Sequence, residues 1–152
     1  MSPSMDRFYN NKEFRDNAES ITSINYHYIF ITKEHAPLLT GAVAYKMQNI
    51  ILDLVVEHGW TIIAIEILID HIHLLINVGT TESPKEIATW IKNRSTYTLK
   101  KEFPHIQRLP TVWGNRFFVA SVGRLTTEEL RRYIEGIKKT RSAIKWRDGN
   151  IT

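Results

Sequence analysis

Two spacings of apolar residues alternate along the chain, and they predict a succession of strands and helices. Four segments rich in β-branched and aromatic residues predict strands, at positions 24–32, 60–69, 71–78 and 117–123. Apolar residues recurring about every four positions predict two helices, one starting after Thr40 and ending at Gly59, the other starting after Ser83. A last amphipathic helix is expected from Thr126 onwards.

The order of these elements predicts the architecture. It is β-α-β-β-α-β followed by one more helix, which indicates an α+β fold of the ferredoxin-like kind. Such a fold is an antiparallel four-stranded sheet with two helices covering one face. A chain of 152 residues suits one domain. We expect a mobile polar tail over residues 1–20 and a single domain over residues 21–152, with the helix that carries Tyr133 at its C-terminal end.

His71 and His73 interrupt the long apolar run of residues 62–76. In a strand both side chains project to the same face, about 7 Å apart along the chain. Neutral imidazole is a favoured ligand of divalent metals, so the pair is a candidate chelate. Two polar side chains on the wet face of an antiparallel sheet are the alternative, and the spacing does not separate the two. His27 could share that face, although a packed strand histidine is the favoured interpretation.

Tyr133 lies at the edge of the apolar stripe of the last predicted helix. Without further context, the favoured interpretation is that it packs at the rim of the core with its hydroxyl in water. As a nucleophile it would need a metal or cationic neighbours, because a phenol has a pKa near 10. Arg131 and Arg132 beside it could help to hold a phosphate group.

The net charge of +4 is distributed unevenly. Residues 1–84 hold 5 basic and 10 acidic residues, whereas residues 85–152 hold 15 and 6. This asymmetry favours a polyanionic partner over a merely solvated basic surface. The candidate contacts to DNA are Lys92, Arg94, Arg116, Arg131 and Arg132. Trp113, Phe117 and Phe118 could stack unpaired bases, although core packing is the favoured role of such aromatic residues.

The composition excludes several kinds of site. The sequence has no cysteine, which rules out disulfides, thiolate zinc sites and a cysteine nucleophile. No apolar run reaches the length of about 18 residues that a membrane helix requires. The polar start is expected to be neither a signal peptide nor a membrane anchor. We therefore expect a cytoplasmic protein without a membrane partner.

Five segments together resemble one protein family. Their order and spacing are similar to those of the single-tyrosine HUH transposases of small insertion sequences, the insertion sequence 200/605 type, where U is a hydrophobic residue. The segments are the first strand at 26–33, the motif Asp-His-Ile-His-Leu-Leu at 70–75, the following helix at 83–95, a tryptophan-led strand at 112–123 and the tyrosine helix at 132–135.

The resemblance implies a metal-dependent endonuclease and strand transferase that acts on single-stranded DNA with hairpin ends. His71 and His73 would hold Mg²⁺ or Mn²⁺, and Tyr133 would attack the scissile phosphate. A 5′-phosphotyrosine and a free 3′-hydroxyl would result. Members of this family are usually homodimers, in which the tyrosine helix can complete the site of the partner.

One position departs from the family pattern. Members commonly carry a glutamine one turn after the tyrosine as a third metal ligand, and this chain has Ile137 there. Glu66, Asp70 or Glu135 could supply a substitute oxygen. Counting back from His71 along an unbroken strand places Glu66 and Asp70 on the face opposite the histidines. Either residue could therefore bind the metal only if the chain bends before the motif. The alternative is a relative that binds hairpin DNA without cutting it, and we favour the active enzyme because both histidines and the tyrosine are present.

Overall fold

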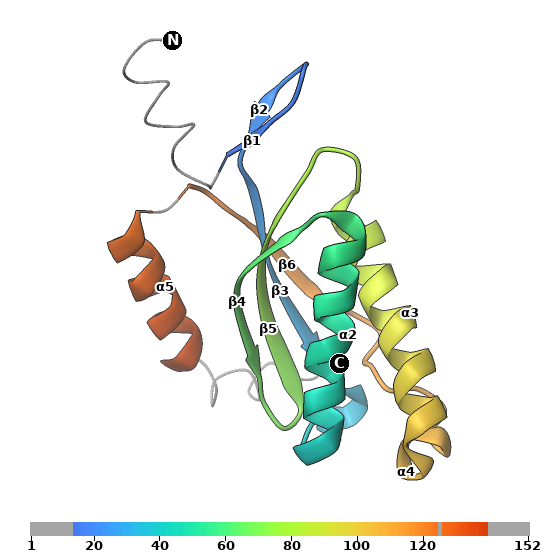
Figure 1. The fold of residues 1–152 in the computed structure, drawn as a ribbon. Coiled ribbons are helices and arrows are strands. Elements are labelled where there is room, and N and C mark those ends of the chain that lie inside the picture. Colours follow the sequence, from blue (N-terminus) through green and yellow to red (C-terminus); the bar gives the residue numbers. More distant parts are fainter. Residues whose placement is uncertain (1–13, 125, 140–152) are drawn as a thin grey trace.

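The computed structural model of the protein describes residues 14–124 and 126–139 (Figure 1). The strands are β1 (Arg15–Asp16), β2 (Ile21–Thr22), β3 (Ile24–Ile31), β4 (Thr61–Ile67), β5 (His71–Val78) and β6 (Phe118–Val122). The helices are α2 (Gly41–His58), α3 (Pro84–Glu102), α4 (Pro104–Gln107) and α5 (Thr127–Lys139), with a 3₁₀ turn, η1, at Lys33–His35.

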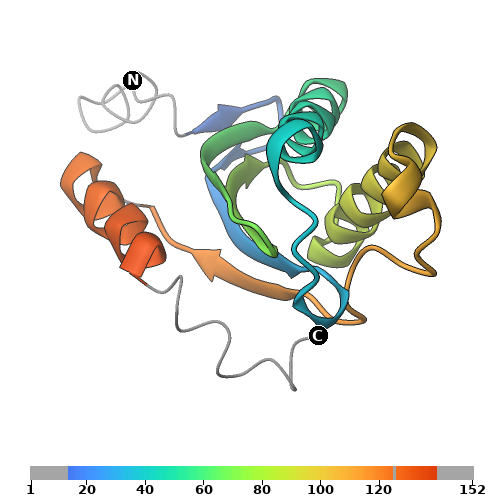
Figure 2. The ribbon, with the colours of Figure 1, turned by 90° about the horizontal axis from the view of Figure 1, so that it is seen from below.

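The four long strands form one antiparallel sheet in the order β4-β5-β3-β6. Helices α2 and α3 cover one face, and α5 lies on the opposite side of the sheet (Figure 2). The predicted α+β, ferredoxin-like fold is confirmed. The described helices include none that is long and apolar enough to cross a membrane.

Local sequence signals explain where the covering helices begin and end. The Ser83 side chain accepts from the backbone N–H of Glu86, and the Glu86 carboxylate accepts from the Ser83 N–H. This capping box satisfies two donors at the start of α3 that have no partner within the helix. Helix α2 ends at Gly59, whose φ of 70° is a left-handed conformation that glycine adopts without steric cost. These boundaries agree with the predicted ones.

Alternation along the strands separates a face that packs under the helices from a face that carries the motif histidines. Tyr28 and Phe30 on β3, with Ile72 and Leu74 on β5, are at most 1% exposed and pack under α2 and α3. The residues between them in sequence face the other side, where α5 lies. The sheet therefore places the motif histidines on one face, as expected from the alternation, and this face lies opposite the two covering helices.

Two segments differ from the sequence-based expectations. Residues 15–22 form a small hairpin rather than a tail, because the Asn17 side chain accepts from two backbone N–H groups of the turn and Arg15 donates to Asn77 on β5. Residues 104–115, for which the apolar pattern indicates neither a strand nor a helix, begin with one helical turn, α4, started by Pro104. The remainder of the predicted tail, residues 1–13, lies outside the described residues.

Candidate active site

The two motif histidines lie side by side on the face of β5 that is turned away from α2 and α3. Their ring centroids are 5.3 Å apart, and the rings are 3% and 2% exposed at His71 and His73. The Nδ1 atom of each ring has a hydrogen-bond partner. The Nε2 atom of each ring is buried and has none. Such a pair of unsatisfied imidazole nitrogens is costly in an apolar interior unless something else binds them.

Asp70 orients the first of these rings. Its carboxylate oxygens lie 2.7 Å from His71 Nδ1 and 3.2 Å from His35 Nδ1. Burial alone would raise the pKa of Asp70, but the hydrogen bonds and charges of these two histidines hold it below its usual value. An ionised carboxylate at Nδ1 keeps the proton of His71 on that nitrogen and leaves Nε2 with a lone pair. His35, in the turn after β3, was not anticipated from the sequence.

His27 connects the second ring to the tyrosine. Its Nε2 lies 3.0 Å from Nδ1 of His73, and its Nδ1 lies 2.6 Å from the hydroxyl oxygen of Tyr133. His27 is thus a satisfied strand histidine, as favoured from the sequence, and it also shares the face of the motif histidines, because both of its ring nitrogens contact candidate site residues. Strand parity was the only sequence signal for this placement. Its contact with α5, which is 106 positions away, depends on the tertiary fold.

Burial sets the ionisation of these groups. Desolvation, together with the neighbouring His27 and His71, lowers the pKa of His73 to about 3. Burial also lowers the pKa of His27 and raises that of Tyr133. At neutral pH, His27 and His73 are therefore uncharged. A neutral imidazole has the lone pair that a cation requires, whereas the tyrosine needs assistance to lose its proton.

The histidine pair fits the kind of metal that the sequence suggested. Two imidazoles whose buried Nε2 atoms have no partner in the chain, each oriented through Nδ1, are a typical half of a divalent-metal site. Among the described residues no group of three or more His, Cys, Asp or Glu side chains is placed to hold an ion. In this arrangement neither Glu66 nor Asp70 completes the ligand set.

The three candidates for the missing ligand lie in different surroundings. Glu66 on β4 lies directly opposite His73 on β5 in the strand register. A turn at residues 68–70 separates the two strands, so counting back from His71 along one unbroken strand does not predict the face of Glu66. Asp70 is engaged by its two histidines, and Glu135 accepts from Arg131. Glu66 is therefore the candidate oxygen that shares the face of His73.

The position of the family glutamine is close to this site. Ile137 is 7% exposed and, with Ile134, lines a cavity of about 20 Å³ together with Glu66 and His73. That volume is close to the minimum that holds one water molecule. Residue 137 is therefore next to one motif histidine, but its side chain supplies no ligand atom.

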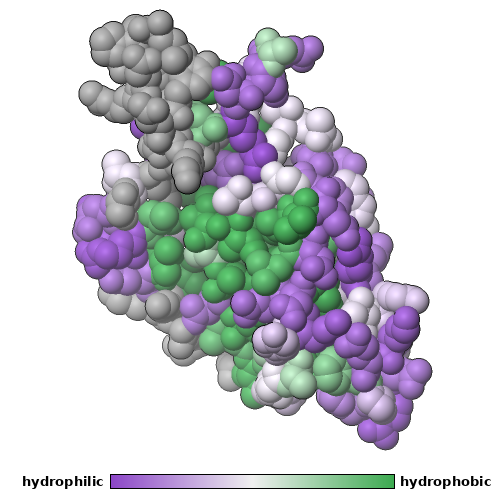
Figure 3. Space-filling model, in the orientation of Figure 1, coloured by the Kyte–Doolittle hydropathy of each residue, from purple (hydrophilic) through white to green (hydrophobic). Residues whose placement is uncertain are grey.

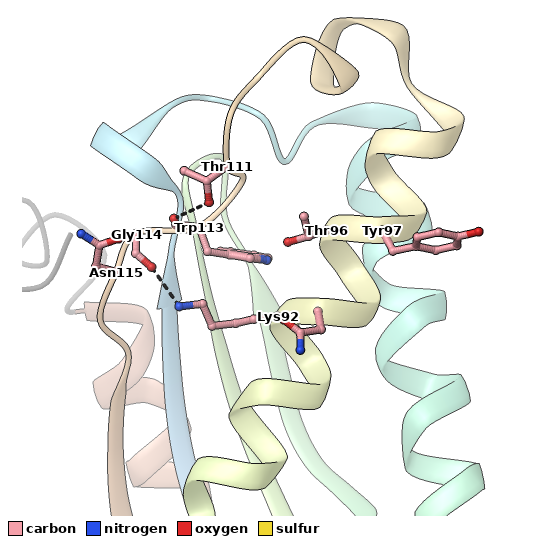
Figure 4. A pocket seen from close by; sticks show the side chains of 8 residues that line it. Lys92, Thr96, Tyr97, Thr111, Trp113, Gly114 and Asn115 are labelled. Atoms are coloured by element: carbon pink, nitrogen blue, oxygen red, sulfur yellow. Dashed lines mark hydrogen bonds between the residues drawn. The ribbon is translucent and has the colours of Figure 1, made fainter.

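Most of the candidate DNA contacts already have partners within the chain. Arg94 donates two hydrogen bonds to Glu57, and Arg131 donates to Glu128 and Glu135. Lys92 reaches from α3 to the carbonyl of Gly114, 2.9 Å away, and both residues line a groove of about 580 Å³ (Figure 4). The groove is lined by Lys92, Asn93, Thr96, Tyr97, Thr111, Trp113, Gly114 and Asn115.

The other candidates divide between surface and core. Arg132 lies 3.6 Å from Glu128, and both side chains are exposed, as is Arg116. Trp113 is 3% exposed and donates from its indole N–H to Ser95, so it serves the core. Phe118 is 41% exposed, and its ring meets that of His27 edge to face at 6.0 Å. Of the three aromatic candidates, Phe118 is the one beside the histidines.

Comparisons with known proteins agree with this picture. Residues 20–136 match the family model described as IS200-like transposase. The chain is 23% identical over 118 residues to the ISDra2 transposase TnpA of Deinococcus radiodurans, a match that covers 76% of this chain and 84% of that protein.

Two solved structures share the fold. One is a crystal structure at 1.90 Å resolution of a protein from Deinococcus radiodurans R1 assigned as a transposase, with a TM-score of 0.66 and 24% identity over 80% of this chain and 96% of that one. The other is the REP-associated tyrosine transposase bound to a REP hairpin, with a TM-score of 0.55 and 18% identity over 82% of this chain and 73% of that one.

The family match extends from β2 to the last turn of α5, and so spans the sheet, the paired histidines and the tyrosine. It covers more than half of the chain, and the resemblance seen in the motifs is thereby confirmed. This chain belongs to the IS200-like transposase family.

Proposed function

We propose that the chain cuts and rejoins single-stranded DNA through Tyr133, in an active site that it builds within one polypeptide. The observation that carries this proposal is the group formed by Tyr133, His27 and His73, with contacts of 2.6 Å and 3.0 Å. Three segments distant in sequence bring a phenol into contact with His27, which in turn contacts the motif histidine His73. A tyrosine that merely packed at the rim of the core would have no reason to contact His27.

His71 and His73 would hold Mg²⁺ or Mn²⁺ through their Nε2 atoms, and the ion when bound would polarise the scissile phosphate as a Lewis acid. Tyr133 is the nucleophile. Its oxygen forms a bond to phosphorus while the bond from phosphorus to the 3′ oxygen of the preceding nucleotide breaks. The phenolic proton is released, the 3′ oxygen takes up a proton, and a 5′-phosphotyrosine and a free 3′-hydroxyl result. Attack by a 3′-hydroxyl on the phosphotyrosine reverses the step and joins strands.

The DNA partner is proposed to be single-stranded DNA with hairpin ends. A structural relative is described as bound to a REP hairpin, which supports this choice. Within the described residues the basic side chains lie mainly on α3, on the segment before β6 and on α5, and these elements flank the sheet on both faces. Arg116 and Phe118 are exposed near the start of β6 and are the proposed first contacts.

A homodimer is also proposed. Strand β4 forms one edge of the sheet. An edge strand next to exposed apolar residues is a typical surface for pairing with a second chain. Figure 3 shows apolar residues gathered over β4 between α5 and α2. Leu52 and Val56 on α2 are exposed by 42% and 81%. Sedimentation equilibrium would test this proposal, and a monomer at micromolar concentration would refute it.

Covalent trapping tests the central proposal. The pure protein is incubated with labelled single-stranded oligonucleotides from both ends of its own flanking DNA, with and without Mn²⁺. We expect a denaturant-resistant adduct with the wild type and with Tyr45→Phe, a tyrosine that is 71% exposed on α2. Tyr133→Phe should retain DNA binding and form no adduct. An undiminished adduct with Tyr133→Phe would place the nucleophile elsewhere.

A second candidate function rests on Ile137. Because its side chain occupies the neighbourhood of His73 without a ligand atom, the chain could bind hairpin DNA without cutting it. Protection of hairpin DNA from nuclease with no covalent product at any Mn²⁺ concentration would support this candidate. A metal-dependent adduct would exclude it.

A further inference from the structure

We infer that His27 is a positioning residue that connects Nδ1 of the metal-binding ring of His73 to the oxygen of Tyr133. This inference rests on the proposed function and assigns a role to a residue outside the paired-histidine motif. The imidazole of His27 contacts side chains from two other elements, β5 and α5. Its residue is 7% exposed, and the Phe118 ring covers it edge to face.

The geometry leaves few arrangements for the protons of this group. A cation at Nε2 of His73 requires a lone pair there, so the proton of the neutral ring must be on Nδ1. That N–H then donates to Nε2 of His27 over 3.0 Å. Since Nε2 of the neutral His27 ring now accepts, its own proton is on Nδ1 and is donated to the oxygen of Tyr133 over 2.6 Å.

The opposite arrangement reverses each donor. If His73 carries its proton on Nε2, its Nδ1 accepts from His27 Nε2, and Nδ1 of His27 then accepts the hydroxyl proton of Tyr133. The two arrangements differ at the nucleophile. In the first, the phenol oxygen accepts a hydrogen bond, which favours the phenolate, whereas in the second the phenol is held as a donor with its proton in place.

The position of the proton on His73 therefore determines, through His27, whether the oxygen of Tyr133 accepts or donates a hydrogen bond. A lone pair at Nε2 of His73 selects the arrangement in which Tyr133 accepts a hydrogen bond. This opposes the effect of burial, which raises the pKa of the phenol. The hydrogen bond between His27 and Nδ1 of His73 also fixes the orientation of the His73 ring, so that Nε2 faces away from His27. A hydrogen-bond partner at the other ring nitrogen commonly orients a metal-binding histidine in this way.

Three substitutions separate the two contacts. In His27→Phe a ring of similar size retains the packing and loses both hydrogen bonds. In His27→Gln the amide reaches the position of Nε2 and retains an acceptor for His73, whereas in His27→Asn it reaches the position of Nδ1 and retains a donor for Tyr133. The control is His105→Phe, at an exposed histidine on α4.

Mn²⁺ affinity, followed by electron paramagnetic resonance of the free ion, gives a readout independent of cleavage. We expect His27→Phe and His27→Asn to bind Mn²⁺ about 10- to 100-fold more weakly, and His27→Gln and His105→Phe to bind it as the wild type does. At saturating Mn²⁺, the rate of adduct formation should fall in His27→Phe and His27→Gln, and fall less in His27→Asn. Thermal melting followed by circular dichroism verifies that each variant is folded.

Two results would overturn the inference. The first is wild-type Mn²⁺ affinity in a folded His27→Phe variant. The second is equal behaviour of His27→Gln and His27→Asn in both measurements, which a purely structural role would produce. Failure of the proposed function is distinguishable from these two results. In that case the wild type itself would form no adduct with any DNA, and the comparison of Mn²⁺ affinities among the variants would remain valid.

Discussion

Acidification of the metal-free protein should destabilise it in a way that depends on His73. Its pKa is lowered to about 3 in the folded chain, against about 6.5 for an exposed histidine. Between these two values the unfolded chain binds a proton that the folded chain does not. The stability associated with the neutral ring is therefore fully present above about pH 6.5 and is lost progressively as the pH falls.

The expected size follows from the linkage relation. One proton of difference changes the free energy of unfolding by about 1.4 kcal/mol per pH unit, so His73 alone accounts for a loss of about 2 kcal/mol between pH 6.5 and pH 5. The lowered pKa of His27 acts in the same direction. Asp70, whose pKa is also lowered, contributes only below about pH 4 and stays outside this range.

Urea unfolding in the presence of EDTA, at pH 7, 6 and 5, measures this effect. The free energy of unfolding of the wild type should decrease by about 2 kcal/mol or more over the range. His73→Gln should flatten the dependence, because a neutral amide replaces the ring, whereas the exposed His105→Gln control should retain it. Wild type and His73→Gln losing stability in parallel would show that the buried ring does not cause the pH dependence.

Further expectations concern other contacts of the site and the core. Asp70→Asn should weaken Mn²⁺ binding about 10- to 100-fold in isothermal titration calorimetry, because the amide no longer holds the proton of His71 on Nδ1 as an ionised carboxylate does; unchanged affinity would remove Asp70 from the site. Ile137→Gln should tighten Mn²⁺ binding in the same assay, since residue 137 lines the cavity beside a ligand histidine, and no change would indicate that a substitute ligand is already in place. Ser95→Ala should cost about 1–3 kcal/mol in urea unfolding, because it leaves the buried indole N–H of Trp113 without its 2.9 Å acceptor; a cost below about 0.5 kcal/mol would contradict this account.

The amino-acid sequence by itself determined the order and boundaries of most elements. The capping box at Ser83 and the glycine at position 59 act within a single turn of chain, so their effect can be predicted without knowledge of the fold. Alternation over β3 and β5 likewise separated the face packed under α2 and α3 from the face of the histidines. The order and spacing of five segments, among them the motif around His71 and His73 and the helix of Tyr133, were sufficient to predict the family.

Only the tertiary structure decided how these residues meet. Alternation indicated that His27 could share the face of the motif but gave no reason for it to contact α5, since that contact depends on how a helix after β6 packs under the sheet. Glu66 could not be placed by counting along the chain, because the turn before His71 resets the alternation and the strand register then pairs it with His73. Periodicity acts along one element, whereas the meeting of β3, β5 and α5 at one imidazole depends on packing between elements distant in the chain.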